Sequence, residues 1–390
     1  MVIGGSVGEI RIGSMDGKLP VALMKSDSVV TYAQPGYLLY LKGDTLVAQP
    51  FDASRAAING PAHPLINRVG RSRYNTAFPL FSVSQNGVLI YQTGTRFVQS
   101  RLTWFDRSGK ASGTVGEPGD YSNPAFSSDG ARLAVCIRDP QAGTRDIWIL
   151  DLVRGGSTRF TFDPSDDTNP VWSPDGSQIA FTSARQGARD LYVKSVSGVG
   201  EEELLRASGV DKNAEDWSPD GTLLSFNHQR EGGYNLWLLA MSAVDHNPTL
   251  FHNTPFREVE STFSPDGKFL TYTSYQSGRG EIFAQSLAPG GGRWQISTHG
   301  GAESHWRSDG KELFFIAGNV LTAVDIRVSG NALVPGIPHA LFKLSAPPGG
   351  RNRYVVTRDG QRFLVVVPEK QGPPPPFTAV VNWPALLPKK

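Results

Sequence analysis

The chain has 390 residues, of which 39% are hydrophobic and 19% charged, and its formal net charge is +2. This composition is ordinary for a soluble globular protein, and a charge so close to neutral disfavours a nucleic-acid-binding surface. No run of 18 apolar residues occurs, so we expect no membrane insertion, and the first residues lack the basic and apolar runs of a signal peptide. The one cysteine, Cys136, excludes an internal disulfide.

One short phrase recurs along almost the whole chain. Trp172–Gly176 reads Trp-Ser-Pro-Asp-Gly, and it returns at Trp217–Gly221 and, with Phe first, at Phe263–Gly267. Weaker copies end at Gly87, Gly130, Gly310 and Gly360, and a decayed copy surrounds Gly36. From Gly87 onward these glycines lie between 43 and 50 residues apart, which is the period of a four-stranded propeller blade.

Each repeat has the pattern of a β-meander. In the repeat at 167–207, a short apolar strand ends at Trp172 and the Ser-Pro-Asp-Gly turn follows. Further strands rich in aromatic and β-branched residues are predicted at Gln178–Ser183, Asp190–Ser195 and Glu203–Arg206. No segment shows sustained helical periodicity, so the sequence predicts an all-β fold built from four-stranded antiparallel blades.

Eight repeat units can be drawn, and we expect one β-propeller over residues 1–390. The units are 31–70, 75–117, 121–162, 167–207, 212–253, 258–298, 302–344 and 350–388. The last unit lacks a fourth strand, whereas residues 9–24 hold two orphan strands, and joining them would remove an exposed sheet edge. The sequence therefore favours eight blades, the last one closed by both termini. The alternative is a six-bladed ring from about Tyr121 onward, with two extra blades in front.

The repeat resembles the TolB-like propeller repeat, also called the WD40-like repeat. The resemblance rests on Ser-Pro-Asp-Gly followed by Ile179-Ala180-Phe181 and then Asp190-Leu191-Tyr192. Several longer phrases resemble the C-terminal propeller of bacterial serine/threonine protein kinases, which implies an extracytoplasmic sensor. These phrases are 102–110, 116–121, 295–298 and 359–364. The sequence departs from those kinases because it has none of the kinase motifs, so kinase activity is not carried over.

No motif for catalysis stands out. Gly4–Gly8 matches the Gly-x-Ser-x-Gly nucleophile elbow, but no α/β pattern follows it to supply an Asp and a His. None of the seven His residues has metal-ligand spacing beside a carboxylate, and the closest cluster is His299, Glu303 and His305. We therefore expect no catalytic residue, no metal site and no cofactor.

Polar residues enter the first strands of the blades, which run beside the central channel of a propeller. The position three residues before the Trp or Phe landmark holds Asn123, Asn169, Ala214, Glu260, Glu303 and Arg353. Such a ring at a pore mouth either hydrates the channel or binds a ligand or partner. As candidate binding residues, the sequence gives Asn123, Asn169, Glu260, Glu303, His305 and Arg353.

Two functions are compatible with these patterns. The first is a non-catalytic binding module for another protein or a small extracellular ligand, because every motif found explains folding and none explains chemistry. The second is a hydrolase or lyase at the channel mouth, which requires convergent carboxylates or a metal. If the Glu260, Glu303 and His305 side chains meet within hydrogen-bond reach in a closed pocket, the enzyme is favoured; if they surround an open channel, it is not.

Overall fold

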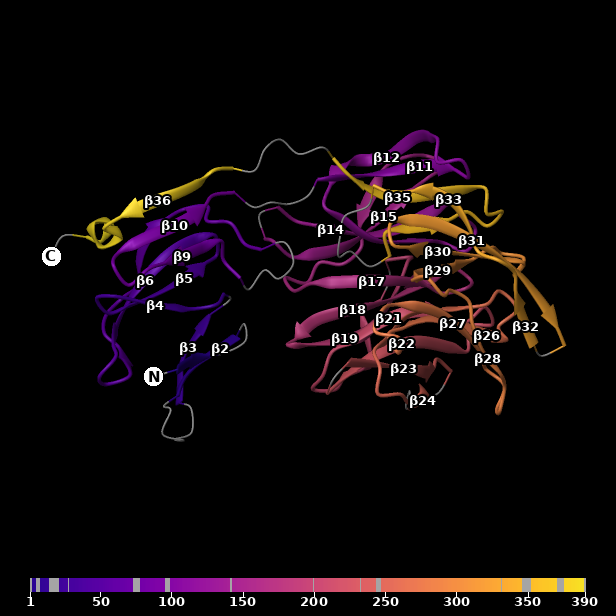
Figure 1. Ribbon diagram of the computed structural model, residues 1–390, viewed down its shortest axis with the longest axis horizontal. Coiled ribbons are helices and arrows are strands. Elements are labelled where there is room, and N and C mark those ends of the chain that lie inside the picture. The colour runs from indigo at the N-terminus through magenta and orange to yellow at the C-terminus, as the bar shows by residue number, and fades with distance from the viewer. Residues whose placement is uncertain are drawn as a thin grey trace. The chain divides into compact units, whose positions relative to one another are not determined.

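The computed structural model describes residues 2–4, 8–13, 21–26, 28–72, 78–94, 99–140, 142–198, 200–231, 233–242, 247–330, 332–345, 352–369 and 375–388. The chain forms two compact units (Figure 1). Unit 1 comprises Met1–Phe97 and Lys370–Lys390, and unit 2 comprises Val98–Glu369.

Unit 2 contains six antiparallel sheets. Five are meanders in chain order: β13-β14-β15-β16, β17-β18-β19-β20, β21-β22-β23-β24, β25-β26-β27-β28 and β29-β30-β31-β32, with β33 also on β31. The bounds are β13 Tyr121–Phe126, β14 Arg132–Arg138, β15 Arg145–Asp151, β16 Ser157–Arg159, β17 Asp167–Trp172, β18 Gln178–Gln186, β19 Ala188–Ser195, β20 Glu203–Arg206, β21 Lys212–Trp217, β22 Leu223–Arg230, β23 Gly233–Ala240, β24 Pro248–His252, β25 Glu258–Phe263, β26 Phe269–Ser274, β27 Glu281–Ser286, β28 Arg293–Gln295, β29 Ala302–Trp306, β30 Glu312–Ala317, β31 Val320–Ser329, β32 Ala332–Pro335 and β33 His339–Lys343. We number these sheets blades 1 to 5.

The sixth sheet joins the two ends of unit 2. Its strand order is β12-β11-β35-β34, with β11 at Ser100–Asp106, β12 at Ala111–Gly119, β34 at Tyr354–Val356 and β35 at Arg362–Pro368. Strand β11 pairs with β35 over its whole length, from Ser100 opposite Pro368 to Asp106 opposite Arg362. Each end of unit 2 therefore contributes two strands to blade 6, which leaves neither end as an unpaired inner edge.

Apolar layers between neighbouring sheets close the ring. Each of the six pairs of adjacent blades shares its own cluster of buried residues, including the pair of blade 6 and blade 1. In that last layer, Leu102, Leu364 and Val366 of blade 6 pack with Leu133 and Val135 of blade 1. Alternate residues of every middle strand face opposite neighbours, so each blade is apolar on both faces. Cys136, for example, is buried between blades 1 and 2.

The Ser-Pro-Asp-Gly turn follows the inner strand of a blade and is fixed by its own side chains. In blade 2, the Ser173 hydroxyl donates to Asp175 Oδ1 at 2.6 Å, and the Ser177 backbone N–H donates to the same oxygen at 3.0 Å. These hydrogen bonds to the charged form lower the pKa of Asp175. Gly176 has a φ of 70°, which an L side chain rarely adopts. The turn is therefore a folding element that accounts for the strongest sequence signal.

Unit 1 is built from three smaller sheets with the orders β1-β2-β3, β4-β5-β6-β7 (with β8 on β6) and β36-β10-β9. The middle sheet has a core on both faces: Leu39 and Leu41 lie in the cluster that contains Leu89 of β10, and Leu38 and Tyr40 lie with Ile10 of β2. The bounds are β1 Val2–Gly4, β2 Gly8–Gly13, β3 Val21–Ser26, β4 Thr31–Ala33, β5 Tyr37–Lys42, β6 Thr45–Asp52, β7 Ala57–Ile58, β8 His63–Ile66, β9 Phe81–Val83, β10 Val88–Gln92 and β36 Phe377–Val381, followed by a 3-10 turn at Trp383–Leu386.

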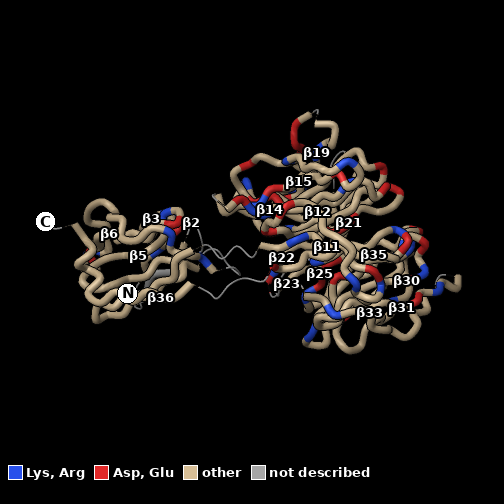
Figure 2. Tube along the Cα trace, turned by 90° about the horizontal axis from the view of Figure 1, so that it is seen from above, with Lys and Arg blue, Asp and Glu red and all other residues tan. Residues whose placement is uncertain are grey.

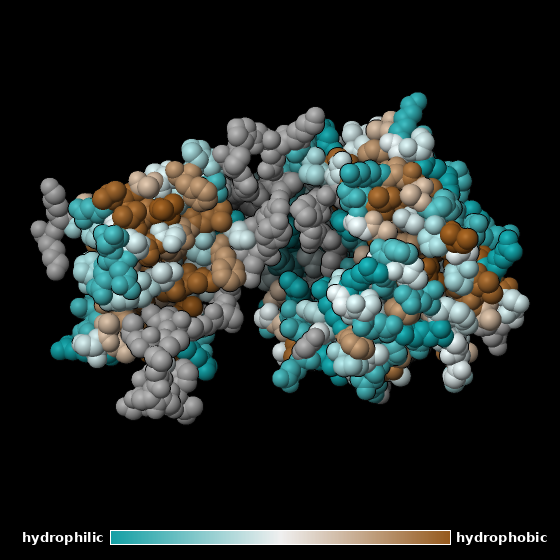
Figure 3. Space-filling model, in the orientation of Figure 1, coloured by the Kyte–Doolittle hydropathy of each residue, from teal (hydrophilic) through white to brown (hydrophobic). Residues whose placement is uncertain are grey.

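One sheet of unit 1 carries apolar side chains on its surface. Ile90, Phe377 and Val381 of the sheet β36-β10-β9 are exposed, whereas Leu89 of the same sheet is buried. Figure 3 shows apolar surface gathered over the β36 and β10 part of unit 1.

The predicted all-β fold with four-stranded antiparallel propeller blades is confirmed, but the predicted count of eight is not. Residues 9–24 do not complete the last unit, because their strands form a sheet with β1, and β35 pairs with β11. The expected repeat at 75–117 is divided between unit 1 and unit 2 of the structure. The expected repeat at 350–388 is divided in the same way, because its strand β36 pairs with β10 of unit 1. The six-bladed alternative differs in its boundary, since the ring begins near Ser100 and not at Tyr121.

Because blade 6 is completed within unit 2, we expect a fragment of residues 98–369 to fold without unit 1. Its urea-unfolding transition should be cooperative, with near-native β-sheet circular dichroism. The matched control is residues 121–369, which lacks β11 and β12 and should unfold at a much lower urea concentration. Equal stability of the two fragments would contradict the ring closure described here.

Candidate functional site

Most inner strands of unit 2 carry a bulge at the channel wall. The register with the second strand shifts between Ser122 and Ala125 in blade 1, and at the corresponding place in blades 2 to 5. Left-handed backbone with φ between 49° and 60° occurs near this place at Asn123, Asn169, Glu260, Glu303 and Asn352. Asn tolerates this conformation, whereas Glu is strained in it, so the surrounding contacts must hold the two glutamates in place.

The side chains at these bulges link one blade to the next. Asn169 Nδ2 donates to the Ala214 carbonyl at 3.3 Å, and Glu260 Oε2 accepts the Glu303 backbone N–H at 3.0 Å. Glu303 in turn accepts the Arg353 backbone N–H at 2.6 Å and the Arg353 side chain at 2.7 Å. The polar ring is therefore a set of hydrogen bonds between sheets whose backbones do not otherwise pair at this place.

Blade 3 differs from its neighbours. Its register shift falls between Ala214 and Asp216, with Glu215 as the extra residue, and Ala214 stands where blades 1, 2, 4 and 5 have Asn or Glu. Asp216 makes the link to blade 4 instead, because its Oδ2 accepts the Phe263 backbone N–H at 2.7 Å. Asp216 has the same register as Ala125, Val171, Thr262 and His305 in the neighbouring blades, so this position of the channel wall is acidic in blade 3.

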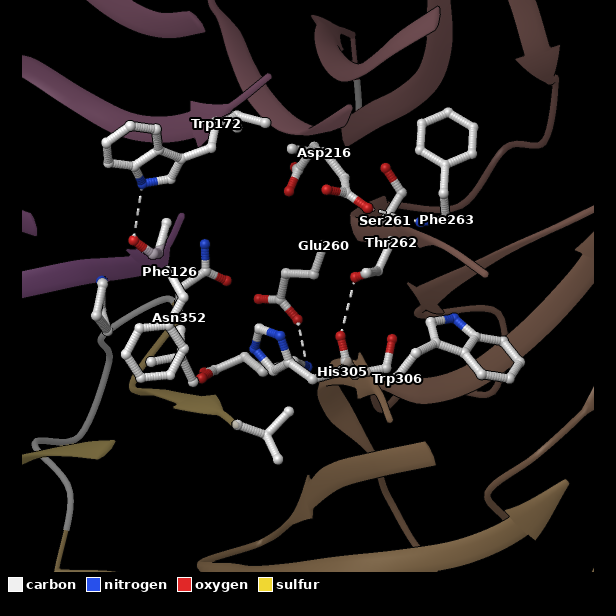
Figure 4. Close-up of a pocket in the computed structure, with 18 of the residues that line it drawn as sticks. Phe126, Trp172, Asp216, Glu260, Ser261, Thr262, Phe263, His305, Trp306 and Asn352 are labelled. Carbon is white, nitrogen blue, oxygen red and sulfur yellow. Dashed lines mark hydrogen bonds between the residues drawn. The ribbon is translucent and has the colours of Figure 1, made fainter. Parts of the chain in front are cut away.

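The channel opens into a hollow of about 310 Å3 near the Ser-Pro-Asp-Gly turns. Its wall combines four carboxylates with aromatic and aliphatic side chains, and no Lys or Arg is among the described lining residues. The acidic members are Glu215, Asp216, Glu260 and Glu303, and the aromatic members are Phe126, Trp172, Phe263, His305 and Trp306. Figure 4 shows Glu260 and His305 pointing into the hollow, with Asp216 on one side and Asn352 on the other.

Two of the carboxyl groups have strongly raised pKa values. Loss of hydration raises the pKa of Asp216 to about 7, even though part of the residue is accessible from the channel. The backbone N–H groups of Phe263 and Trp217 act against this rise, and nearby Glu215 contributes to it. Burial raises the pKa of Glu303 to about 7, against the lowering effect of Arg353. The hollow therefore becomes more negative as the pH rises through 7.

His305 supplies a neutral imidazole beside these acids. Burial lowers the pKa of His305 to about 4, so the ring is uncharged at neutral pH. The ring contacts Tyr354 edge-on, with 4.7 Å between centroids, and it has a backbone hydrogen bond to Tyr354. Nε2 is buried without a hydrogen-bond partner, so that bond involves Nδ1. With Nδ1 donating, Nε2 carries the lone pair and is an acceptor.

Of the six candidate residues from the sequence, Glu260, Glu303 and His305 line the hollow. Asn123 and Asn169 are buried and join each other at 3.3 Å, and Arg353 holds Glu303.

The candidate residues from the sequence do not include Asp216. They also do not include the aromatic residues Phe126, Trp172 and Trp306, which the sequence identifies only as landmarks of the repeat. The signal for Asp216 was present. The position before the landmark holds Ala125, Val171, Thr262 or Val355 in other blades, and an Asp in blade 3 and a His in blade 5 break that pattern.

The arrangement proposed to distinguish an enzyme does not occur in the form required. Glu260 accepts a backbone N–H of Glu303, the Glu303 carboxylate is held by Arg353, and Nε2 of His305 has no hydrogen-bond partner. No group of three or more His, Cys, Asp or Glu residues that could hold a metal is found in the described part of the chain. Within the nucleophile-elbow match, Gly5–Val7 lie outside the described residues.

Charges of both signs are interspersed along unit 2 (Figure 2), in keeping with the near-neutral net charge. Among the described residues, no helix has the length and apolar character to cross a membrane.

Comparison with known proteins supports the fold. Residues 106–210 match the TolB beta propeller domain. A TolB protein from Agrobacterium tumefaciens is similar in structure, with a TM-score of 0.56 and 17% identity over 70% of this chain and 99% of that one. TolB from Acinetobacter baumannii gives a TM-score of 0.49 and 19% identity, covering 64% of this chain and 66% of that one.

An oligogalacturonate lyase from Vibrio parahaemolyticus gives a TM-score of 0.47 and 12% identity, covering 74% of this chain and 96% of that one. No curated protein matches the chain in sequence. The match over residues 106–210 and the similarity to the Agrobacterium tumefaciens protein establish a TolB-like propeller fold.

The raised pKa of Asp216 predicts how stability depends on pH. Because folding raises this pKa, the folded state holds the proton more tightly, and stability is lost as the pH rises from about 4 to about 7. Asp216→Asn keeps an acceptor for Phe263 and removes the charge, so it should stabilise the protein at pH 8 by about 2–4 kcal/mol and much less at pH 4.

Urea unfolding at both pH values measures this difference. Asp220→Asn, in the following turn, is a control of opposite sign: the pKa of Asp220 is lowered by its hydrogen bonds to Ser218 and Thr222, so this change should destabilise the protein at pH 8. A destabilised Asp216→Asn variant at pH 8 would contradict the desolvation argument.

The link between Glu303 and Arg353 predicts a structural penalty. Glu303→Ala leaves a partly buried guanidinium and a backbone N–H without their acceptor, which should cost about 3–5 kcal/mol of unfolding free energy. Glu201→Ala, at an exposed loop position, should change stability by less than about 0.5 kcal/mol. Comparable effects of the two changes in chemical denaturation would show that Glu303 does not hold the ring.

Proposed function

We propose that this protein is a non-catalytic binding module whose site is the hollow of the propeller channel. The observation that carries the proposal is the composition of that wall: aromatic and aliphatic surface beside a few convergent polar groups, one of which, His305 Nε2, has no partner. Concave sites with this mixture are the usual form of a ligand pocket.

The rigidity of the ring supports the same function. The polar links between blades and the six apolar layers fix the wall, so little ordering would be needed when a partner binds. The candidate residues Asn123, Asn169, Glu303 and Arg353 would then preserve the shape of the site, and the candidates Glu260 and His305 would touch the ligand.

The partner in this proposal is another protein or a small extracellular ligand. The resemblance of phrases such as Leu102–Lys110 to the propellers of bacterial serine/threonine kinases supports a sensing or docking role in a kinase-type signalling system. On the same resemblance, we also propose an extracytoplasmic location. A hydrolase or lyase remains the alternative, but neither the Glu260 nor the Glu303 carboxylate is hydrogen-bonded to Nε2 of His305, so the geometry does not favour it.

Photo-cross-linking at the hollow tests this function. A benzoylphenylalanine in place of Phe126, which lines the hollow, should give a discrete adduct after irradiation in extract of the source cells. The same residue in place of Phe162, which is 64% exposed outside the hollow lining, is the control. Intact-mass analysis detects a protein and a small-molecule adduct alike. Equal labelling at both positions, or none in folded protein, would count against a binding site in the channel.

A further inference from the structure

The described lining of the hollow is rich in carboxylate acceptors, and it holds two buried polar atoms without a partner, His305 Nε2 and the donor Trp306 Nε1. Asp216 and Glu260 face the hollow together with His305, whose Nε2 is a buried acceptor without a partner. A buried polar atom without a hydrogen bond costs free energy, so a molecule that brings donors to this place would recover it.

The charge of the wall selects the sign of that molecule. The described lining contains four carboxylates and no Lys or Arg. The guanidinium of Arg353 is already held by Glu303, and that of Arg132, which lies over the Trp172 ring, donates to the Gly176 carbonyl. An anion would be repelled, whereas a cation would gain from each ionised carboxylate in a site of low effective dielectric constant.

The rest of the wall is suited to an apolar stem behind the charged group. Phe126, Trp172 and Val355 line the hollow together with Pro124 and Pro170. The volume of about 310 Å3 lies at the lower end of ligand pockets, which suits one extended side chain or a small amine.

We propose that the channel hollow binds a primary ammonium or guanidinium group on an aliphatic stem, with Asp216, Glu260 and His305 Nε2 as the acceptors of its N–H groups. This inference rests on the proposed binding function and adds the chemical class of the ligand. A free small amine and an Arg or Lys side chain of a peptide share this chemistry, and the experiment distinguishes the two sources.

Isothermal titration calorimetry at pH 8 with the full chain makes the test. The probes are agmatine, the peptide acetyl-Ala-Arg-Ala-amide and the same peptide with citrulline, which has nearly the same shape as arginine but no charge. We expect the arginine peptide or agmatine to bind at least about 10-fold more tightly than the citrulline peptide, since hydrogen bonds to charged groups are the stronger ones. Binding of agmatine alone would identify a small amine as the source, and tighter binding of the peptide would identify a protein side chain.

Two variants locate the acceptors. Asp216→Asn removes the charge but keeps an acceptor for the Phe263 backbone N–H. His305→Phe keeps an aromatic ring against Tyr354 but removes Nε2. Each variant should bind the guanidinium probes about 10-fold or more weakly than the unchanged protein does. Glu201→Gln, at an exposed loop position, is the matched control and should bind as the unchanged protein does.

The outcomes separate this inference from the proposed function. If neither charged probe binds the folded protein, or if the citrulline peptide binds equally well, the inference is overturned. If the inference is overturned but a specific photo-adduct forms at position 126, the binding function stands and the ligand has a different chemistry. If neither probe binding nor a photo-adduct is found, the inference and the proposed function are both overturned.

Discussion

The structure of the propeller depends on side chains that reach from the inner strand of one blade to that of the next. Separate sheets arranged around an axis have no shared backbone ladder, and their apolar layers alone do not fix how the inner strands meet. Asn169, Asp216, Glu260 and Glu303 supply this connection by bonding to backbone groups of the following blade. The same residues therefore set the shape and the charge of the channel.

This double role explains why the channel wall is acidic although burial of carboxylates is unfavourable. Arg353 lowers the pKa of Glu303 and backbone donors lower that of Asp216, yet burial raises both to about 7. Blades 1 and 2 make their links with the neutral amides of Asn123 and Asn169. The carboxylate of blade 3 gives the channel the charge on which the proposed selectivity for a cation rests.

Local pattern in the sequence was sufficient to predict the strands, the turns and the period. The Ser-Pro-Asp-Gly turn depends on residues within five positions, so each copy can be recognised alone. The partner of β35 could not be found in this way, because its pairing with β11 spans most of unit 2 and no residue type encodes the choice. The boundary at Phe97 was missed for the same reason: β9–β10 and β11–β12 follow one another with the spacing of one repeat, yet they belong to different sheets. The position three residues before the landmark is Ala214 in blade 3, so the candidate residues did not include the acid directly before Trp217.

The order of the strands in unit 1 has a consequence for how the protein is made. Strand β36 pairs with β10, and the whole of the propeller lies between them in the chain. During synthesis on the ribosome, β10 can pair with β36 only after every blade of the propeller has been synthesised. Since Ser100 and Pro368 face each other across one ladder, the chain leaves the propeller beside the point where it enters it. If a blade failed to form, the two chain segments of unit 1 would stay apart. Unit 1 would then assemble only when the propeller of unit 2 is complete.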